Sequence, residues 1–323
     1  MKKKFIEEKL KQGDILLTTT IKPISGVIRA FTKSDISHVM LYVKPYSVID
    51  ATDEGVQARN TQRIYLHKDS SAYVLRVKGG LSDQQFKIIN YKIRIQIGIE
   101  YSKGEAIIAG LGGSNDWSKK QFCSRLVAQA FQEAGIKLVD NPNYCSPEEI
   151  KNSKELEVIN EAIVLMEDPK DDDVNLPQLM RDCTNFILEG ARKRDSSIQG
   201  FNDLYAYLKA KPEEDNYISQ LYIDSGYLEL WKIEMTVNSW LYDFDDFNRA
   251  EMPNEEKRNV CKRMIPDISN SIHMRMSELA KVKSVFIEYP FTTFKNLIRL
   301  YENLIILHKT SSEVIQKWLS LNS

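Results

Sequence analysis

Two short apolar segments joined by a tight connection constrain the fold of this chain more than any other feature. Residues 37–43 (Ser-His-Val-Met-Leu-Tyr-Val) are rich in β-branched and large apolar side chains, which predicts a strand. Residues 48–52 (Val-Ile-Asp-Ala-Thr) predict a second strand after a short turn. Strands joined by so short a loop pair antiparallel, so we expect an antiparallel sheet in the first half of the chain.

Further elements are predicted around this pair of strands. Residues 15–19 and 73–77 read as strands, and residues 82–98 read as a helix because apolar side chains recur there at helical spacing. Residues 5–11 predict a short amphipathic helix, and residues 23–31 predict a loop leading into a short helix.

Residues 119–131 predict a helix that carries Cys123 in its first turn. The apolar face of this helix consists of Leu126, Val127, Ala130 and Phe131. A Gly-rich loop lies upstream, and Gly135 lies where a helix C-cap is expected. A thiol at a helix N-terminus feels the positive end of the macrodipole, which favours the thiolate. Most cysteines in such apolar helices are nevertheless small core residues, so the helix alone leaves the role of Cys123 open.

His38 and Asp50 are the candidate partners of this thiol. His38 is the only one of four histidines that opens an apolar strand beside other strands; taken alone, it reads as a half-buried strand histidine. Asp50, between apolar neighbours on the next strand, requires a partner because an unpaired buried charge is costly. In cysteine hydrolases a carboxylate holds an imidazole, and the imidazole faces a thiol at a helix N-terminus. The register of the strands is not readable, so Glu54 remains a weaker alternative to Asp50.

Bulk composition excludes some classes of protein. The chain has 323 residues with 44 basic and 45 acidic side chains, so its charge gives no reason to expect a nucleic-acid partner. The four cysteines are widely spaced and form no CxxC pair, which argues against a disulfide framework. We expect no metal ion and no cofactor.

The sequence also bears on location. No apolar stretch has the length of a transmembrane helix. The charged start, Met-Lys-Lys-Lys, lacks the apolar run of a secretory signal. We therefore expect a cytoplasmic protein, or one exported by a route without a cleavable signal peptide.

The composition changes after residue 166, which suggests two domains. Residues 167–176 are polar and charged and read as a linker between a domain at 1–166 and a helical domain at 177–323. Helices are expected there around residues 201–210, 217–244, 254–264, 268–280, 294–307 and 311–321. The helical domain is expected to act as a lid, a substrate platform or a partner-binding module. Its aromatic residues Trp231, Trp240, Tyr242 and Phe244 read either as interface anchors or, more often at helical spacing, as core.

Several of these segments together resemble a known family. They are residues 13–16 (Gly-Asp-Ile-Leu), 37–39 (Ser-His-Val), 48–51 (Val-Ile-Asp-Ala), 98–101 (Gly-Ile-Glu-Tyr), 122–127 (Phe-Cys-Ser-Arg-Leu-Val) and 146–149 (Ser-Pro-Glu-Glu). In this order they resemble the circularly permuted branch of the NlpC-type papain-like cysteine hydrolases, the YiiX/YebB-like group, over roughly residues 10 to 165. In that branch the histidine strand precedes the cysteine helix, whereas ordinary NlpC enzymes run cysteine first.

The resemblance implies a fold and a set of site residues. The fold would be α+β: a permuted papain-like or NlpC-like domain, with an antiparallel sheet packed on the cysteine helix, followed by a mostly α-helical C-terminal domain. Cys123 would be the nucleophile, His38 the base and Asp50 the residue that orients His38. Tyr101 and Ser124 would be candidates for contact with the substrate or the oxyanion.

This sequence departs from the pattern of the family at two positions. The third member of the triad is more often glutamate in this branch, and aspartate is shorter by one methylene. Arg125 stands where the family often carries an acidic residue, which changes the charge expected near the thiol.

The resemblance also implies an activity. A thiol hydrolase or acyltransferase would attack an amide or ester carbonyl through an acyl-enzyme. The substrate would be a peptide, as in peptidoglycan, or a lipid, and a role as a bacterial effector or toxin would fit the absence of a signal peptide. The alternative is a non-enzymatic papain-like binding protein whose helical half docks on a partner.

Overall fold

The computed structural model describes residues 1–19, 34–101, 121–166 and 175–322. The chain forms two compact units, Met1–Asp172 with Gln199–Asp203, and Asp173–Ile198 with Leu204–Ser323. The helix predicted within residues 23–31, the Gly-rich loop before the cysteine helix and most of the linker predicted at 167–176 lie outside the described residues.

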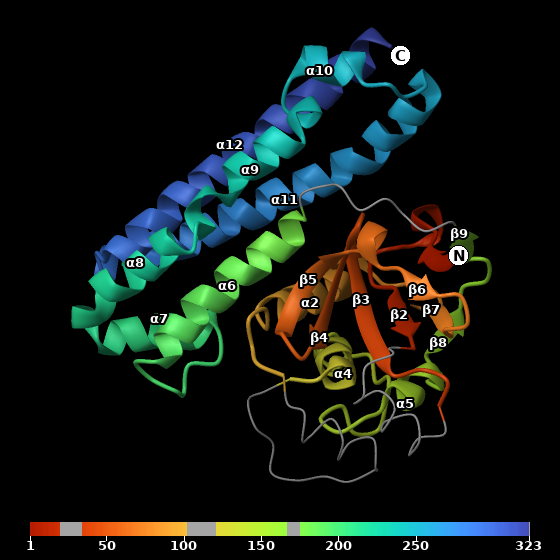
Figure 1. Cartoon of the computed structure of the whole chain (residues 1–323), viewed down its shortest axis with the longest axis horizontal. Coiled ribbons are helices and arrows are strands. Elements are labelled where there is room, and N and C mark those ends of the chain that lie inside the picture. Colours follow the sequence, from red (N-terminus) through yellow and green to blue (C-terminus); the bar gives the residue numbers. More distant parts are fainter. Residues whose placement is uncertain (20–33, 102–120, 167–174, 323) are drawn as a thin grey trace. The chain divides into compact units, whose positions relative to one another are not determined.

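An antiparallel sheet forms the centre of the first unit, in the strand order β5-β4-β3-β2-β7-β8 (Figure 1). Its strands are β2 (Ile15–Thr18), β3 (His38–Lys44), β4 (Ser47–Thr52), β5 (Gly55–Asn60), β7 (Ala72–Val77) and β8 (Leu156–Val158). The pairing of β3 with β4 through a tight connection confirms the antiparallel arrangement expected from their sequences. The short strand β8 carries no pattern that the sequence reading detected.

A second, three-stranded sheet has the order β6-β1-β9, with β1 at Lys2–Phe5, β6 at Leu66–His67 and β9 at Ile163–Met166. The amphipathic helix predicted for residues 5–11 is therefore wrong. Phe5 ends strand β1, and only Glu7–Lys9 forms a short 3₁₀ turn. Antiparallel pairing of β1 with β9, which is distant in sequence, overrides the weak local helical pattern here.

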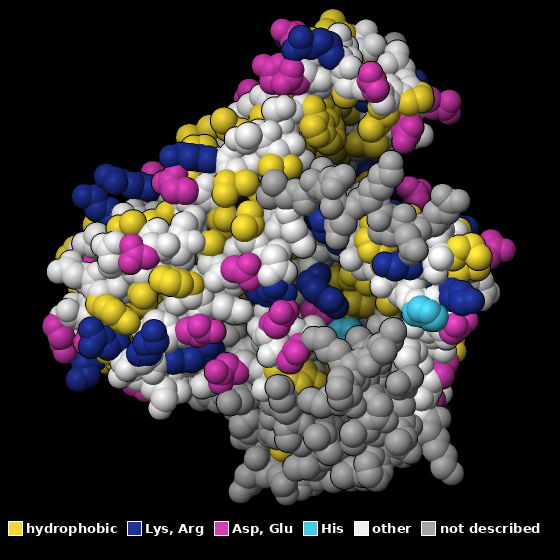
Figure 2. All heavy atoms as spheres, in the orientation of Figure 1, with side chains coloured by type: hydrophobic (Ala, Val, Ile, Leu, Met, Phe, Trp, Pro, Cys, Tyr) yellow, Lys and Arg dark blue, Asp and Glu magenta, His cyan; other side chains and the backbone are white. Residues whose placement is uncertain are grey.

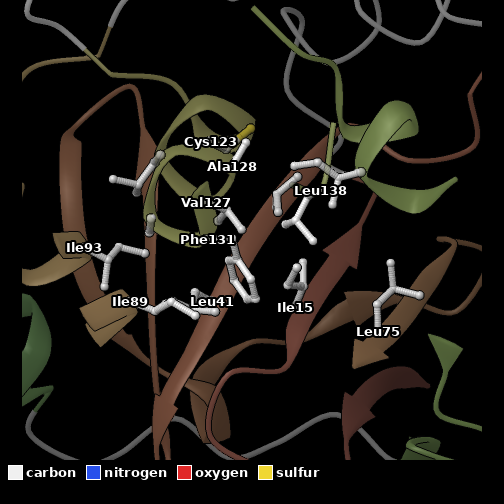
Figure 3. Packing of buried hydrophobic residues seen from close by; sticks show 14 of the residues in the cluster. Ile15, Leu41, Leu75, Ile89, Ile93, Cys123, Val127, Ala128, Phe131 and Leu138 are labelled. Atoms are coloured by element: carbon white, nitrogen blue, oxygen red, sulfur yellow. The ribbon is translucent and has the colours of Figure 1, made fainter. Parts of the chain in front are cut away.

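Two helices, α2 (Asp83–Arg94) and α4 (Cys123–Glu133), pack with the sheet in one apolar core. Figure 3 shows Cys123 at one end of its helix, with Val127 and Phe131 among the sheet residues Leu41 and Ile15. Each fully buried side chain of this size contributes about 1.5–3 kcal/mol by leaving water. This packing fixes α4 against the sheet and so fixes the position of its first residue.

The ends of the helices follow the local sequence. Gly135, with a φ of 79°, follows the end of α4 and takes the left-handed conformation expected after a helix. Helix α5 (Pro147–Lys151) begins with a capping box in which Ser146 and Glu149 exchange hydrogen bonds, and Pro147 occupies its first position. The position of Gly135 agrees with the C-cap expected from the sequence.

The described part of the second unit consists of helices. They are α6 (Leu176–Arg192), α7 (Phe201–Ala210) from Leu204 onward, α8 (Asp215–Asp224), α9 (Leu230–Val237), α10 (Phe244–Arg249), α11 (Asn254–Glu288) and α12 (Thr292–Leu321), with short 3₁₀ turns between some of them. The long helices α11 and α12 lie side by side (Figure 1). None of the helices in the described ranges combines the length and the apolar character needed to cross a bilayer.

Helix boundaries in this unit differ from the prediction. The single helix predicted for residues 217–244 is wrong, because Gly226 has a φ of 76° and ends the α8 region. The helices predicted at 254–264 and 268–280 are one continuous helix, α11, and those predicted at 294–307 and 311–321 are one helix, α12.

The aromatic residues of the helical unit pack mainly inside it. Trp240 and Phe244 pack against a buried cluster that includes Phe247 and Trp318, and the Trp240 ring stacks on Phe247. Tyr242 donates a hydrogen bond of 3.2 Å to Glu234 Oε1. These contacts favour the core interpretation of Trp240 and Phe244.

Over the face shown in Figure 2, basic and acidic side chains are interspersed.

The turn before β2 is held by a buried ion pair. Asp14 accepts two bonds of 2.7 Å from the Arg76 guanidinium, one from Nε and one from Nη2, and a third from the Lys11 backbone N–H. Gly13 has a φ of 91°, and a Cβ there would lie 2.3 Å from Leu81 Cδ1. The Gly-Asp pair therefore serves the backbone turn and the ion pair that lead the chain into the sheet.

We predict that Asp14→Ala destabilises the protein by about 3 kcal/mol, because it leaves the Arg76 guanidinium without its carboxylate in a largely buried place. Urea denaturation followed by circular dichroism measures the change. The matched control is Asp140→Ala, since Asp140 forms an exposed ion pair with Lys137. Equal denaturation midpoints for the two variants would contradict the assigned importance of the Asp14–Arg76 pair.

Candidate active site

His38 and Asp50 are brought together by the register of β3 and β4. Met40 pairs with Asp50, and His38 lies two residues before Met40, so alternation places all three on one face of the sheet. His38 Nε2 lies 2.6 Å from Asp50 Oδ2, and both side chains are buried. Glu54, the weaker alternative, lies in the exposed turn between β4 and β5.

A third side chain, Arg59, joins this pair from β5. Asp50 pairs with Gln57 across β4 and β5, and Arg59 lies two residues further along the same face. Its Nη2 atom donates a hydrogen bond to Asp50 Oδ2 and lies 3.4 Å from His38 Nε2. The Arg59 side chain is 35% exposed, whereas Asp50 is fully buried.

The charges of these groups shift their proton affinities. Burial raises the pKa of Asp50, but the Arg59 charge and the hydrogen bond from His38 outweigh burial and hold this pKa below its usual value. Burial lowers the pKa of His38, but hydrogen bonds to Asp50 and then to Cys123 outweigh it and raise this pKa to about 9. The arrangement therefore favours a carboxylate at Asp50 and an imidazolium at His38.

Cys123 is the first residue of α4 and approaches His38 from the helix side. The Cys123 thiol lies close enough to the imidazole to raise the pKa of His38, while Nε2 faces Asp50. Phe122 occupies the N-cap position and offers no side-chain hydrogen bond to the helix. The first backbone N–H groups of a helix have no intrahelical partner, so those of α4 are available beside the sulfur. Such a place binds anionic groups.

Tyr101 lies close enough to this site for its charged groups to shift the pKa of the Tyr101 phenol. It forms a parallel bridge with Gln121 and packs against Phe122 and Tyr144. Burial, followed by the negative charges of Cys123, Asp53 and Asp50, raises the pKa of its phenol strongly. Tyr101 is therefore a neutral hydroxyl group, able to donate a hydrogen bond near the thiol.

Ser124 and Arg125 face the loop before α5. The Ser124 hydroxyl donates a 2.5 Å hydrogen bond to the Cys145 carbonyl. The Arg125 guanidinium lies over the rings of Phe122 and Tyr144 and donates through Nε to the Asn143 carbonyl at 2.7 Å. Both side chains thus tie the start of α4 to residues 143–145.

Cys145 is a second cysteine in the first unit. It is buried, and burial raises the pKa of its thiol, so it is a poor nucleophile in the folded protein. Within the described ranges, no three side chains of His, Cys, Asp or Glu gather into a group that could hold a metal ion.

Comparison with known proteins identifies the class to which this fold and site belong. Residues 9–185 match the model of a family described as permuted papain-like amidase enzymes, YaeF/YiiX, C92 family. The chain belongs to this family of permuted papain-like amidases, which confirms the α+β, permuted papain-like fold expected from the sequence.

Two individual proteins are similar to parts of the chain. The probable lipoprotein peptidase YaeF of Escherichia coli (strain K12) is 26% identical over 160 aligned residues, which cover 39% of this chain and 57% of that protein. The crystal structure of metalloprotein yiiX from Escherichia coli O157:H7 shares 18% identity and covers 50% of this chain and 99% of its own, with a TM-score of 0.32.

The sequence reading missed Arg59. The signal was present, because alternation over residues 56–59 places Gln57 and Arg59 on one face of the strand and the apolar Val56 and Ala58 on the other. A half-buried arginine on such a strand requires an acceptor, and Asp50 is the carboxylate on the neighbouring strand β4. The β4–β5 register that reveals the pairing is fixed only in the folded sheet.

We predict that stability falls as the pH rises from about 6.5 through 9, the range between the usual histidine pKa and that of His38. The folded state holds the His38 proton more tightly than the unfolded state does, so its stabilisation is complete below this range and lost above it. Urea denaturation midpoints measured across the range test the prediction.

His38→Gln should flatten this part of the stability profile. His67→Gln is the matched control, since the His67 side chain is 55% exposed and lies on β6. A profile that is unchanged by His38→Gln, or flattened equally by His67→Gln, would contradict the assigned cause.

Proposed function

We propose that this protein is a cysteine amidase that cleaves an amide bond in a peptide-type substrate. Cys123 is the nucleophile, His38 is the general acid and base, and Asp50 orients His38. The observation that carries the proposal is the buried His38 ring, which lies 2.6 Å from Asp50 Oδ2 and whose pKa is raised by both Asp50 and the Cys123 thiol at the start of α4. A catalytic triad needs a nucleophile, a base within reach of the nucleophile, and a carboxylate that orients the base.

The first half of the reaction forms the acyl-enzyme. The Cys123 thiolate attacks the carbonyl carbon, and a C–S bond forms as the carbonyl oxygen gains negative charge. The backbone N–H groups in the first turn of α4, including that of Cys123, stabilise this oxyanion. The His38 imidazolium then donates its proton to the leaving nitrogen, and the C–N bond breaks.

The second half of the reaction releases the product. His38, now neutral, accepts a proton from water, and the resulting hydroxide attacks the thioester carbonyl. The C–S bond breaks, a carboxylic acid leaves, and the thiolate–imidazolium pair is restored. Asp50 keeps the ring in one orientation through both halves and stabilises its charged form.

Two further lines support an amide substrate. The family is described as amidases, and the relative YaeF carries the name of a probable lipoprotein peptidase. We therefore place peptides, including acylated ones, ahead of phospholipids as substrates. The helical unit is proposed to present or cover the substrate, or to bind a protein partner.

We predict that iodoacetamide labels Cys123 faster than a free model thiol at slightly acidic pH, because the imidazolium of His38 stabilises the thiolate. His38→Ala should remove this advantage. Peptide mapping by mass spectrometry gives the rate at each cysteine. Cys145 and Cys261 are buried, as Cys123 is, and therefore serve as internal controls for the effect of burial. A Cys123 that reacts no faster than the model thiol, with a rate insensitive to His38→Ala, would overturn the proposed nucleophile and base.

We predict that the protein cleaves amide bonds in a panel of acylated peptides and muropeptides, that Cys123→Ala abolishes this activity, and that His38→Ala lowers kcat by about 10²–10⁴-fold. Mass spectrometry detects the products, and a phospholipid panel runs in parallel. Cys123-dependent products from phospholipids alone would replace the amide with a lipid ester. No product in either panel would favour the non-enzymatic binding protein.

A further inference from the structure

Among the described residues, Arg59 is the charged group beside the His38–Asp50 pair that the proposed mechanism does not use. We infer that Arg59 is a positioning residue of the site: it holds Asp50 as a carboxylate and shares the Asp50 Oδ2 atom with His38. This inference rests on the proposed function, because it concerns the same triad.

The geometry shows two donors at one acceptor atom. His38 Nε2 and Arg59 Nη2 both approach Asp50 Oδ2, while Oδ1 is buried and has no hydrogen-bond partner in the described part of the chain. A bidentate arginine–carboxylate pair would use both oxygens. Here the guanidinium approaches the same oxygen as the imidazole, so the two cations compete for it.

The distance between the two donors indicates whether Arg59 favours or opposes protonation of His38. Nε2 and Nη2 lie 3.4 Å apart. When His38 is an imidazolium, neither nitrogen can accept a hydrogen bond from the other, and two positive charges face each other at short range. Arg59 therefore opposes protonation of His38, whereas Asp50 and Cys123 favour it.

The other titratable groups near the pair are few in the described ranges. His38 faces Asp50 from β4, Arg59 from β5 and Cys123 from α4. The neutral phenol of Tyr101 also lies within electrostatic range of Asp50. Arg59 is the only cation in this set apart from His38 itself, so the proton affinity of His38 depends on it directly.

This sharing has a consequence for catalysis. A carboxylate that belonged to His38 alone would hold the imidazolium too tightly, and the proton that must pass to the leaving nitrogen would transfer less readily. Because Arg59 also donates a hydrogen bond to Asp50 Oδ2, it keeps the carboxylate ionised and weakens the interaction of that carboxylate with the His38 imidazolium. Arg59 acts on His38 both directly and through Asp50.

The decisive experiment titrates His38 by NMR in full-length protein labelled at its histidines, in a Cys123→Ala background so that no reaction is needed. We expect Arg59→Met to raise the pKa of His38 by about one unit relative to that background. Arg59→Lys should produce a smaller rise, because it keeps the charge and loses the guanidinium geometry. Arg249→Met is the matched control, since the Arg249 side chain is 75% exposed in the helical unit.

An unchanged or lowered pKa of His38 in Arg59→Met would overturn the inference. Should Arg59→Met fail to fold, Arg59→Gln removes the charge while keeping a donor, and the same rise is expected.

In enzyme with Cys123 intact, Arg59→Met should also move the alkaline limb of the kcat/KM profile to higher pH by the same amount, while a merely structural role would lower activity without moving it. A wild type that hydrolyses nothing would refute the proposed function, and the NMR titration would still decide the inference about Arg59.

Discussion

The site depends on one constraint, the presence of a fully buried carboxylate at Asp50. A buried charge persists only where paired donors compensate for lost hydration. Three consecutive strands meet this requirement: β3 supplies His38, β4 supplies Asp50 and β5 supplies Arg59. The sheet therefore serves as the support of the charge arrangement, and α4, packed in the apolar core on the same sheet, adds the thiol at its first residue.

The fold of the first unit and the candidate site could be predicted from sequence to different extents. Residues 37–43 and 48–52 contain their strand signal locally, because β-branched and large apolar side chains stand between turn residues. The cysteine helix is likewise readable from its apolar face. The pairing of His38 with Asp50 rather than Glu54 follows from the strand register, which depends on the folded sheet. Arg59 escaped notice for the same reason.

The errors in the rest of the chain have physical causes. Residues 5–11 read as a helix, but β1 gains its partners from β6 and β9, which lie far along the chain. In the helical unit, α11 runs through Pro266, although proline inside a helix costs about 3 kcal/mol. Packing along α12 on both sides of Pro266 offsets this cost, and tertiary packing of this kind is invisible to a local reading.

The chain order of the site has a consequence for how activity arises during folding. His38 and Asp50 are only 12 positions apart and belong to adjacent strands of one hairpin, so they can meet early, by local contacts. Cys123 comes much later in the chain and must reach them by closing a long loop, which costs more entropy. A growing chain would thus form the His38–Asp50 pair before the proposed nucleophile reaches it. The proposed activation of Cys123 would then occur only in molecules whose first unit is already assembled, so that partly folded chains carry an ordinary thiol.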